Sequence, residues 1–316
     1  MWRRRSWCGP RRRGIVAESR PEGRLSAPMT ELVWQAAVSG VVLGLVYALV
    51  ALGLSLIWGV MDVVNLAHAE YLMLAMYATY WLWALGRVDP ALAVPVVVPV
   101  FFGLGWLTYQ ALVRRIVRAP LAAQIFATFG LLFILRYGAF AAFGPNVYGV
   151  WRPGEGTVLV LGVPVAASKV TAGLVSLAAF GLLAAFLRYT KTGKALQAAA
   201  QNREVALALG IPVDRMYALS WGLGIATAAL AGVFLIPFYQ VSPTIGDAFL
   251  LLAFASVVLG GFGRVDGALV GGLCIGLLEN LLGTLVSPTF KFLFVFAAFV
   301  AMLLVRPQGL LGDVGR

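Results

Sequence analysis

Residues 169–188, KVTAGLVSLAAFGLLAAFLR, form an apolar run that is followed by the polar stretch KALQAAAQNREVALALG at 194–210 and by a second apolar run at 217–237. A bilayer core of about 30 Å requires roughly 20 apolar residues from a helix that crosses it, so both flanking runs are long enough to span. The polar stretch between them must lie outside the hydrocarbon. This alternation of long apolar runs with short polar connectors decides the fold class.

The composition of the whole chain supports the same class. The 316 residues are 61% hydrophobic and 12% charged, and their mean hydropathy is +0.91. Soluble domains are about 45–50% apolar and about 25% charged. A transmembrane β-barrel is excluded because its strands are about 10 residues long and alternate in polarity. We therefore predict an all-α polytopic membrane protein with about eight or nine transmembrane helices.

Two of the apolar segments are unusual. The segment 248–262 is short for a span, and the residues at 61–70 are too polar for an ordinary one. Nine spans, or eight spans with one broken or re-entrant piece, are equally compatible with the sequence. Glycines at small-xxx-small spacing, Gly40/Gly44 and Gly267/Gly271/Gly272, predict close helix packing. The predicted helices are 32–58, 65–85, 91–112, 121–143, 169–188, 217–237, 248–262, 267–286 and 291–305.

Positive charge near the ends of short connectors predicts which of them face the cytoplasm. Arginine and lysine gather at 114–118 and 188–215 and recur at Arg264 and Arg306. The long connector at 144–168 has one arginine, and 238–247 has none. We expect the basic connectors, the polar stretch and the C-terminus to be cytoplasmic, which places the start of the first span outside.

The N-terminal residues 1–28 carry eight arginines and two glutamates, which together supply six of the net charge of +11. Three interpretations are a basic arm, a targeting peptide, and upstream sequence translated from a misassigned start codon. A secretory signal requires an apolar core, which this tail lacks, and a nucleic-acid arm is disfavoured on a membrane protein. Arginines outside the membrane would also oppose the orientation rule. We favour the third interpretation, with Met29 as the native start and residues 29–316 as one transmembrane domain.

The polar stretch predicts two short helices within 192–212. Thr192 is expected to cap the first helix and Asn202 the second. Glu204 lies in the first turn of the second helix, where the helix dipole favours an anion. Gly210 suits a C-terminal left-handed position. Such a pair suits insertion into a cleft on a soluble partner, and an amphipathic helix resting on the membrane surface is the alternative.

Five blocks in the same order resemble the inner-membrane permeases of ABC importers for branched-chain amino acids, the LivH type. The segment GKALQAAAQNREVALALGIPVDR is similar to the coupling loop of that family. Two departures are Ala69, where the family usually has glycine, and Gln197, which replaces the arginine common in the first coupling helix and predicts weaker docking electrostatics. The other blocks are NLAHAEYLML from Asn65, IFATFGLLFIL from Ile125, VVLGGFGRVDGALVGGLCIGLLE from Val257 and RPQGLLG from Arg306.

The resemblance implies a multi-pass subunit of the bacterial inner membrane without enzymatic activity of its own. Its implied partners are a second related permease, two cytosolic ABC ATPase subunits, a periplasmic substrate-binding protein and membrane lipids, with no nucleic acid. A complete P-loop motif is missing from the sequence, so ATP is expected to bind to the partners and no cofactor is expected in this chain. The implied coupling residues are Lys194, Ala198, Ala199, Asn202, Glu204, Ala206 and Gly210.

Ionisable and polar side chains within the spans are candidates for a substrate pathway or for the bundle interior, because buried charge is costly in lipid. Asn65, His68 and Glu70 either face a cavity near the cytoplasmic entrance of the second span or hold the broken backbone through hydrogen bonds, and we favour the second role. Two placements of Glu279 fit the sequence equally well: it pairs with Arg136 across the bundle, or Glu279 and Asn280 approach the outer interface. The candidates are Asn65, His68, Glu70, Thr128, Arg136 and Glu279.

A metal site and a disulfide framework are not expected. The chain has a single histidine, too few for the usual zinc ligand sets. Its two cysteines, Cys8 and Cys274, have neither metal-like nor disulfide-like spacing.

Three other functions are compatible with parts of the pattern. A urea or short-amide permease of the same family would have similar spans, because the binding protein selects much of the substrate. A secondary transporter would have broken helices and often inverted repeats, but no internal repeat is clear and it would not need the polar stretch. An intramembrane enzyme would need a catalytic constellation, which we do not find.

Overall fold

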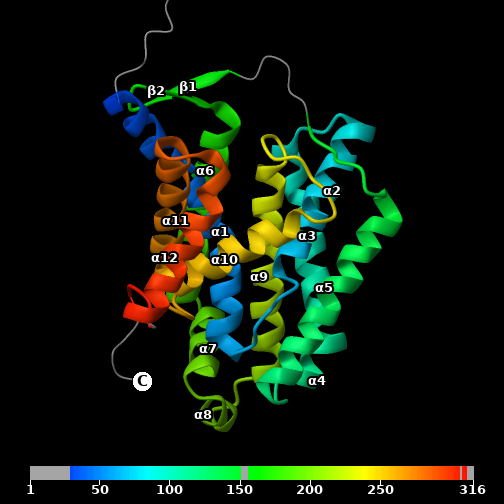
Figure 1. Cartoon of the computed structure of the whole chain (residues 1–316). Coiled ribbons are helices and arrows are strands. Elements are labelled where there is room, and N and C mark those ends of the chain that lie inside the picture. The colour runs from blue at the N-terminus through cyan, green and yellow to red at the C-terminus, as the bar shows by residue number, and fades with distance from the viewer. Residues whose placement is uncertain (1–28, 151–155, 307, 312–316) are drawn as a thin grey trace, which may run out of the picture.

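The computed structural model describes residues 29–150, 156–306 and 308–311, so the prediction for residues 1–28 lies outside the described residues. Figure 1 shows a helical bundle with a strand hairpin at its upper end and the short helices α7 and α8 at its lower end. The helices are α1 (Met29–Met61), α2 (His68–Gly86), α3 (Pro90–Thr108), α4 (Arg114–Ile116), α5 (Leu121–Phe143), α6 (Ala167–Tyr189), α7 (Lys191–Gln201), α8 (Arg203–Ala208), α9 (Val213–Leu235), α10 (Ile245–Gly260), α11 (Val265–Leu285) and α12 (Lys291–Val305), with a π-helical turn η1 (Tyr109–Val113), a 3₁₀ turn η2 (Pro288–Phe290) and strands β1 (Thr157–Val160) and β2 (Val163–Ala166).

All nine apolar segments predicted from the sequence are helical, and their ends agree with the prediction to within a few residues. In the described part of the chain, 6 helices are long and apolar enough to cross a membrane, and α10 and α12 are apolar but shorter. The antiparallel hairpin β1–β2 is the one sheet among the described residues. The fold is therefore a polytopic helical bundle, and the count of eight or nine spans stays a prediction.

The basic connectors gather at the lower end of the bundle. Arg114, in the connector between α3 and α5, pairs with Asp214 at the start of α9 across 3.4 Å. At the upper end, the indole nitrogen of Trp34 donates a hydrogen bond to the carbonyl oxygen of Leu161 in the hairpin turn at 3.1 Å. The charge asymmetry on which the predicted orientation depends thus coincides with the two ends in Figure 1.

The centre of the bundle is α1, which is buried along most of its length against α9 and α11. Where α1 crosses α11, a Cβ atom on Gly276 would overlap the backbone of Gly44, and one on Gly272 would overlap the backbone of Ala48. Small residues at this spacing let two helix backbones touch in lipid. The predicted close packing of the glycine pairs is therefore confirmed for α1 and α11.

The chain re-enters the bundle between α1 and α2. Residues 62–67 are not helical, and α2 starts at His68. The Nε2 atom of His68 lies 3.1 Å from the carbonyl oxygen of Val50. Val50 is about three helical turns, or about 16 Å, from the lower end of α1 at Met61. The predicted break is therefore present, but α2 begins near mid-depth, which corrects the expectation that Asn65, His68 and Glu70 lie near the cytoplasmic entrance.

A second helix also starts inside the bundle. The short helix α10 begins at Ile245, and a Cβ atom on Gly246 would lie 2.8 Å from the Oε1 atom of Glu70 in the first turn of α2. The other end of α10 is at the lower end of the bundle, where the amide of Leu310 donates to the carbonyl oxygen of Leu259 at 2.8 Å. The N-termini of α2 and α10 thus meet in the interior.

The α1–α11 crossing predicts opposite effects for the same substitution at two helical glycines. Gly276→Ala is expected to lower the stability of the protein by about 1–3 kcal/mol, because the added methyl group must displace backbone. Gly181→Ala in α6, where a Cβ atom would meet nothing within 4 Å, is expected to be neutral or slightly stabilising because alanine favours helix. The measurement is the melting temperature of each detergent-solubilised variant, followed by size-exclusion chromatography. Equal melting temperatures would contradict backbone contact at this crossing.

Candidate functional site

The first helix of the polar stretch is α7, and Thr190 caps it. The Oγ1 atom of Thr190 accepts a hydrogen bond from the amide of Gly193 at 2.9 Å and donates one to the carbonyl oxygen of Phe186 at 2.7 Å. The prediction that Thr192 caps this helix was wrong. The helix starts two residues earlier because Gly193 packs directly on α6, where a Cβ atom would overlap the backbone of Phe186 and Leu187.

The second helix, α8, has the ends predicted from the sequence. The Oδ1 atom of Asn202 accepts hydrogen bonds from the amides of Glu204 and Val205, both at 3.0 Å. Glu204 lies in the first turn. Gly210 has a φ of +77°, the left-handed conformation that ends the segment. These local predictions are confirmed. They could be made from the sequence because a helix cap depends on a few adjacent residues.

The seven proposed coupling residues differ in how far their side chains are buried. Ala199 and Ala206 are buried against the bundle, Ala198 is half-buried, and Lys194, Asn202, Glu204 and Gly210 are exposed. The buried alanines therefore anchor α7 and α8 rather than offer a surface to a partner.

The exposed surface of α8 includes apolar side chains that were not among the predicted coupling residues. Val205, Leu207 and Leu209 are all exposed, Leu209 to 73%. Val205 and Leu209 are four residues apart, so they share one side of the helical turn. That spacing is the signal in the sequence that would have identified them. An exposed apolar patch on a protruding segment is typical of a docking surface.

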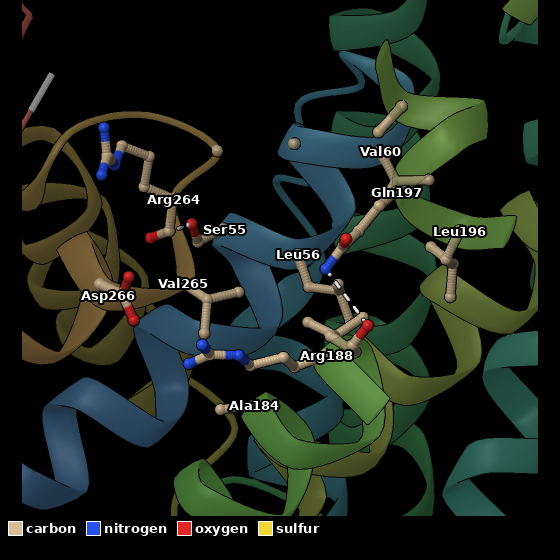
Figure 2. Close-up of a pocket in the computed structure, with 14 residues that line it drawn as sticks. Ser55, Leu56, Val60, Ala184, Arg188, Leu196, Gln197, Arg264, Val265 and Asp266 are labelled. Atoms are coloured by element: carbon tan, nitrogen blue, oxygen red, sulfur yellow. Dashed lines mark hydrogen bonds between the residues drawn. The ribbon is translucent and has the colours of Figure 1, made fainter. Parts of the chain in front are cut away.

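A pocket of about 410 Å³ lies where α7 meets the lower ends of α1 and α6 and the connector between α10 and α11. Figure 2 shows Arg188 extending into it. The Nε2 atom of Gln197 donates a hydrogen bond to the carbonyl oxygen of Leu187 at 3.2 Å, and the hydroxyl of Ser55 donates one to the carbonyl oxygen of Arg264 at 3.0 Å. Gln197, where the resembling family often has arginine, thus ties α7 to α6. Through this pocket α7 borders both α1 and the start of α11.

Polar side chains hold the non-helical segment 62–67 in place. The Oδ1 atom of Asn65 accepts a hydrogen bond from the amide of Ala67 at 3.1 Å, and the hydroxyl of Thr128 on α5 lies 3.0 Å from the carbonyl oxygen of Val64. Asn65, His68 and Thr128 are all fully buried. Backbone groups in the hydrocarbon need internal hydrogen-bond partners. This is the structural role that the sequence favoured for Asn65 and His68, and Thr128 contributes to it as well.

An ion cluster joins α2, α5 and α10. The guanidinium group of Arg136 on α5 donates to Glu70 in the first turn of α2, through Nε at 3.2 Å, and to Asp247 in the first turn of α10. Of the two placements that the sequence left open for Glu279, the pairing with Arg136 was wrong. The carboxylate of Glu279 instead accepts a hydrogen bond from the ammonium group of Lys291 at 2.8 Å. The reason is placement: α5 and α11 lie on opposite sides of the bundle (Figure 1).

The ion cluster carries more negative than positive charge. Each carboxylate lies at a helix N-terminus, where the helix dipole stabilises an anion, and Arg136 serves both. The Oε2 atom of Glu70 has no hydrogen-bond partner among the described residues, and the side chain of Asp247 is 54% exposed. A charge at this depth does not face lipid. We therefore expect Asp247 to face a water-filled cavity or another subunit.

Five of the six candidate pathway residues thus lie together around the break, and Glu279 lies elsewhere. Asp247 was missed, although it is the one charged residue between Arg215 and Arg264 in the sequence. Among the described residues there is no group of three or more histidine, cysteine, aspartate and glutamate side chains placed to hold a metal ion.

Comparison with known proteins gives consistent matches over most of the chain. The family model described as the permease component of the branched-chain amino acid transport system matches residues 36–303. The LivH permease protein of the high-affinity branched-chain amino acid transport system of Escherichia coli K12 is 30% identical over 290 residues, covering 87% of this chain and 94% of that protein. LivH of Salmonella typhimurium is 31% identical, covering 87% and 94%, and BraD of Pseudomonas aeruginosa is 26% identical, covering 88% and 95%.

No solved structure matches the chain. The family model covers more than four-fifths of the sequence, and it includes the re-entrant break, the ion cluster and both helices of the polar stretch. The chain belongs to the family of permease components of branched-chain amino acid transport systems.

Proposed function

We propose that this chain is a transmembrane subunit of an ABC importer of the bacterial inner membrane and that it carries branched-chain amino acids inward. In this proposal two cytosolic ATPase subunits bind and hydrolyse ATP, so the chain needs no cofactor and has no enzymatic activity. A second related permease and a periplasmic substrate-binding protein complete the importer. The lower end of the bundle faces the cytoplasm, as the basic connectors there favour.

The observation that carries the proposal is the build of α7 and α8. Their buried residues, including Gly193, Ala199 and Ala206, fix the pair to the bundle, while Val205 and Leu209 remain exposed at its tip. A helix pair that served only to rest on its own bundle would bury such side chains. The arrangement fits a rigid element that inserts into a cleft of an ATPase and moves with it.

The same contacts supply a route for coupling. When ATP closes the ATPase pair, movement of α7 reaches α6 through Gly193 and Gln197 and reaches α1 directly, because α7 also packs against α1 beside the pocket in Figure 2. Since α11 is in backbone contact with α1, a shift there alters the centre of the bundle. For ATP to drive such a change, the ATPases must bind the two states with different affinity.

The substrate assignment follows from the relatives, whose names give branched-chain amino acid transport. The ion cluster is compatible with it. Glu70 and Asp247 outnumber Arg136, and Asp247 is exposed at a depth where a zwitterionic solute would need polar partners. A neutral solute such as urea gains less from an uncompensated carboxylate.

Transport of leucine tests the proposal directly. Proteoliposomes that hold this chain with its co-encoded permease, ATPases and binding protein are expected to take up labelled leucine only when ATP is present. Unlabelled isoleucine and valine are expected to compete, and urea is not. ATP-dependent uptake of labelled urea without leucine uptake would support an ABC importer but would change the assigned substrate to urea. Leucine uptake that does not require ATP would contradict an ABC mechanism.

The exposed tip of α8 predicts a docking defect without a folding defect. The double substitution Val205→Asp/Leu209→Asp is expected to weaken binding of the ATPase subunits and to lower ATP-driven uptake at least about tenfold, because a hot-spot side chain typically contributes 2 kcal/mol or more. The melting temperature should not change, since neither side chain packs in the bundle. Ala206 is unsuitable for this purpose because it is buried.

The matched control for α8 is Leu159→Asp in strand β1, whose side chain is also 73% exposed but lies at the upper end. This variant is expected to bind the ATPase subunits as the wild type does. Normal ATPase binding by Val205→Asp/Leu209→Asp would place the docking surface elsewhere on the chain.

The ion cluster predicts that neutralising all its members is less harmful than removing its cation alone. Arg136→Gln leaves Glu70 and Asp247 without a counter-charge, and loss of one partner of a buried pair costs about 3–5 kcal/mol. We expect a large fall in melting temperature and loss of uptake. Glu70→Gln/Arg136→Gln/Asp247→Asn is expected to recover much of the melting temperature.

The control for the ion cluster is Arg87→Gln at the upper end of α2, where the guanidinium group lies 5.6 Å from the centre of the Trp83 ring. This variant should melt close to the wild type. A triple variant that melts no higher than Arg136→Gln would contradict the charge-balance explanation.

A further inference from the structure

A second pocket at the lower end of the bundle is lined by arginines. It has a volume of about 450 Å³ and lies where the connector between α3 and α5 meets α8 and the start of α9. Arg114 and Arg118 come from the connector, Arg203 from α8, and Arg215 from the first turn of α9. Elements that are far apart in the sequence thus bring four guanidinium groups to one hollow.

Acidic side chains of the described residues do not balance the positive charge in this arginine pocket. Asp214 is the one acidic residue of the lining, and it pairs with Arg114 across 3.4 Å with both side chains about half exposed. Such surface pairs contribute little to stability. Arg118, Arg203 and Arg215 form no ion pair with any described residue. Like charges held close together repel, so this arrangement favours an anion between them.

The surroundings of the arginine pocket indicate the kind of anion. Helix α5 begins at Leu121, directly after the connector, and exposes Phe126, Phe129 and Phe133 along one face. The planar guanidinium fork matches the oxygens of a phosphate group. Basic pockets between spans on the cytoplasmic side bind anionic lipid head groups. We propose that the arginine pocket binds the phosphate head group of an anionic phospholipid of the cytoplasmic leaflet, with its acyl chains along α5.

The two other sources of an anion are the partner protein and a free phosphate ion. The position of the pocket favours a lipid over both. Arg114 and Arg118 lie at the lower end of the apolar span Pro90–Ile116, where basic side chains meet lipid head groups. Leu207 of α8 lines the opposite side of the pocket, next to the proposed docking residues Val205 and Leu209. A free phosphate ion would gain nothing from the apolar face of α5. The inference depends on the lower end being cytoplasmic and is independent of the transported substrate.

A lipid in this pocket would also fix the position of α8. Arg203 belongs to α8, and the other three arginines belong to the connector and α9. One head group held by all of them bridges the coupling segment to the bundle. The importer would therefore couple ATP hydrolysis to uptake less well in a bilayer without anionic lipid.

The test counts lipids on the purified full chain by native mass spectrometry during titration with dioleoylphosphatidylglycerol. Arg118→Gln/Arg215→Gln is expected to weaken lipid retention at least about tenfold, because it removes two of the four guanidinium groups. Arg188→Gln/Lys191→Gln removes the same charge from another connector at the same end and should change retention less than about twofold. Arg118→Lys/Arg215→Lys keeps the charge and should retain more lipid than the glutamine variant, which distinguishes lost binding from misfolding.

Three results would overturn the proposal. The first is equal retention of phosphatidylglycerol by the wild type and Arg118→Gln/Arg215→Gln. The second is displacement of the lipid by millimolar inorganic phosphate, which would identify a soluble anion as the ligand. The third is weaker binding of the purified ATPase subunits by the variant with unchanged lipid retention, which would assign these arginines to the partner. A failure of leucine uptake in proteoliposomes would leave the lipid result unaffected.

Discussion

The need to satisfy every backbone polar group inside the hydrocarbon is the constraint on which this structure depends. Residues 62–67 leave the helical conformation inside the bundle, so their amides and carbonyls require partners there. Asn65 supplies one from the segment itself and Thr128 supplies one from α5. The break is tolerated only because α1, α2 and α5 enclose it, and this requirement fixes how those helices are arranged.

The two interior helix starts follow from the same constraint. A helix that begins inside a membrane protein exposes unpaired amides and the positive end of its dipole. Glu70 and Asp247 place negative charge at these two starts, and Arg136 balances part of it from a third helix. The glycine contacts between α1 and α11, by contrast, bring two continuous helices into direct backbone contact. The bundle thus combines one closely packed pair, α1 and α11, with two helices, α2 and α10, that begin in its interior.

The sequence predicted most of the helices and few of the partners. Nine apolar segments were placed correctly because a long apolar run between polar connectors predicts a helix without regard to its neighbours. The caps at Asn202 and Gly210 were predicted because they depend on adjacent residues. Thr190 was missed since the start of α7 is decided by the packing of Gly193 on α6. The wrong pairing of Arg136 has the same origin: a charge in an apolar run reveals its depth but not which helix lies opposite.

The half-exposed carboxylate of Asp247 has a consequence for how the assembly is made. In the isolated chain Arg136 is its counter-charge, and the exposed half of the carboxylate needs either water or the surface of another subunit. If another subunit supplies that surface, the assembled complex covers a charge that the isolated chain exposes, and assembly stabilises this region of the bundle. Production of the protein should accordingly begin from all membrane subunits expressed together rather than from this chain alone.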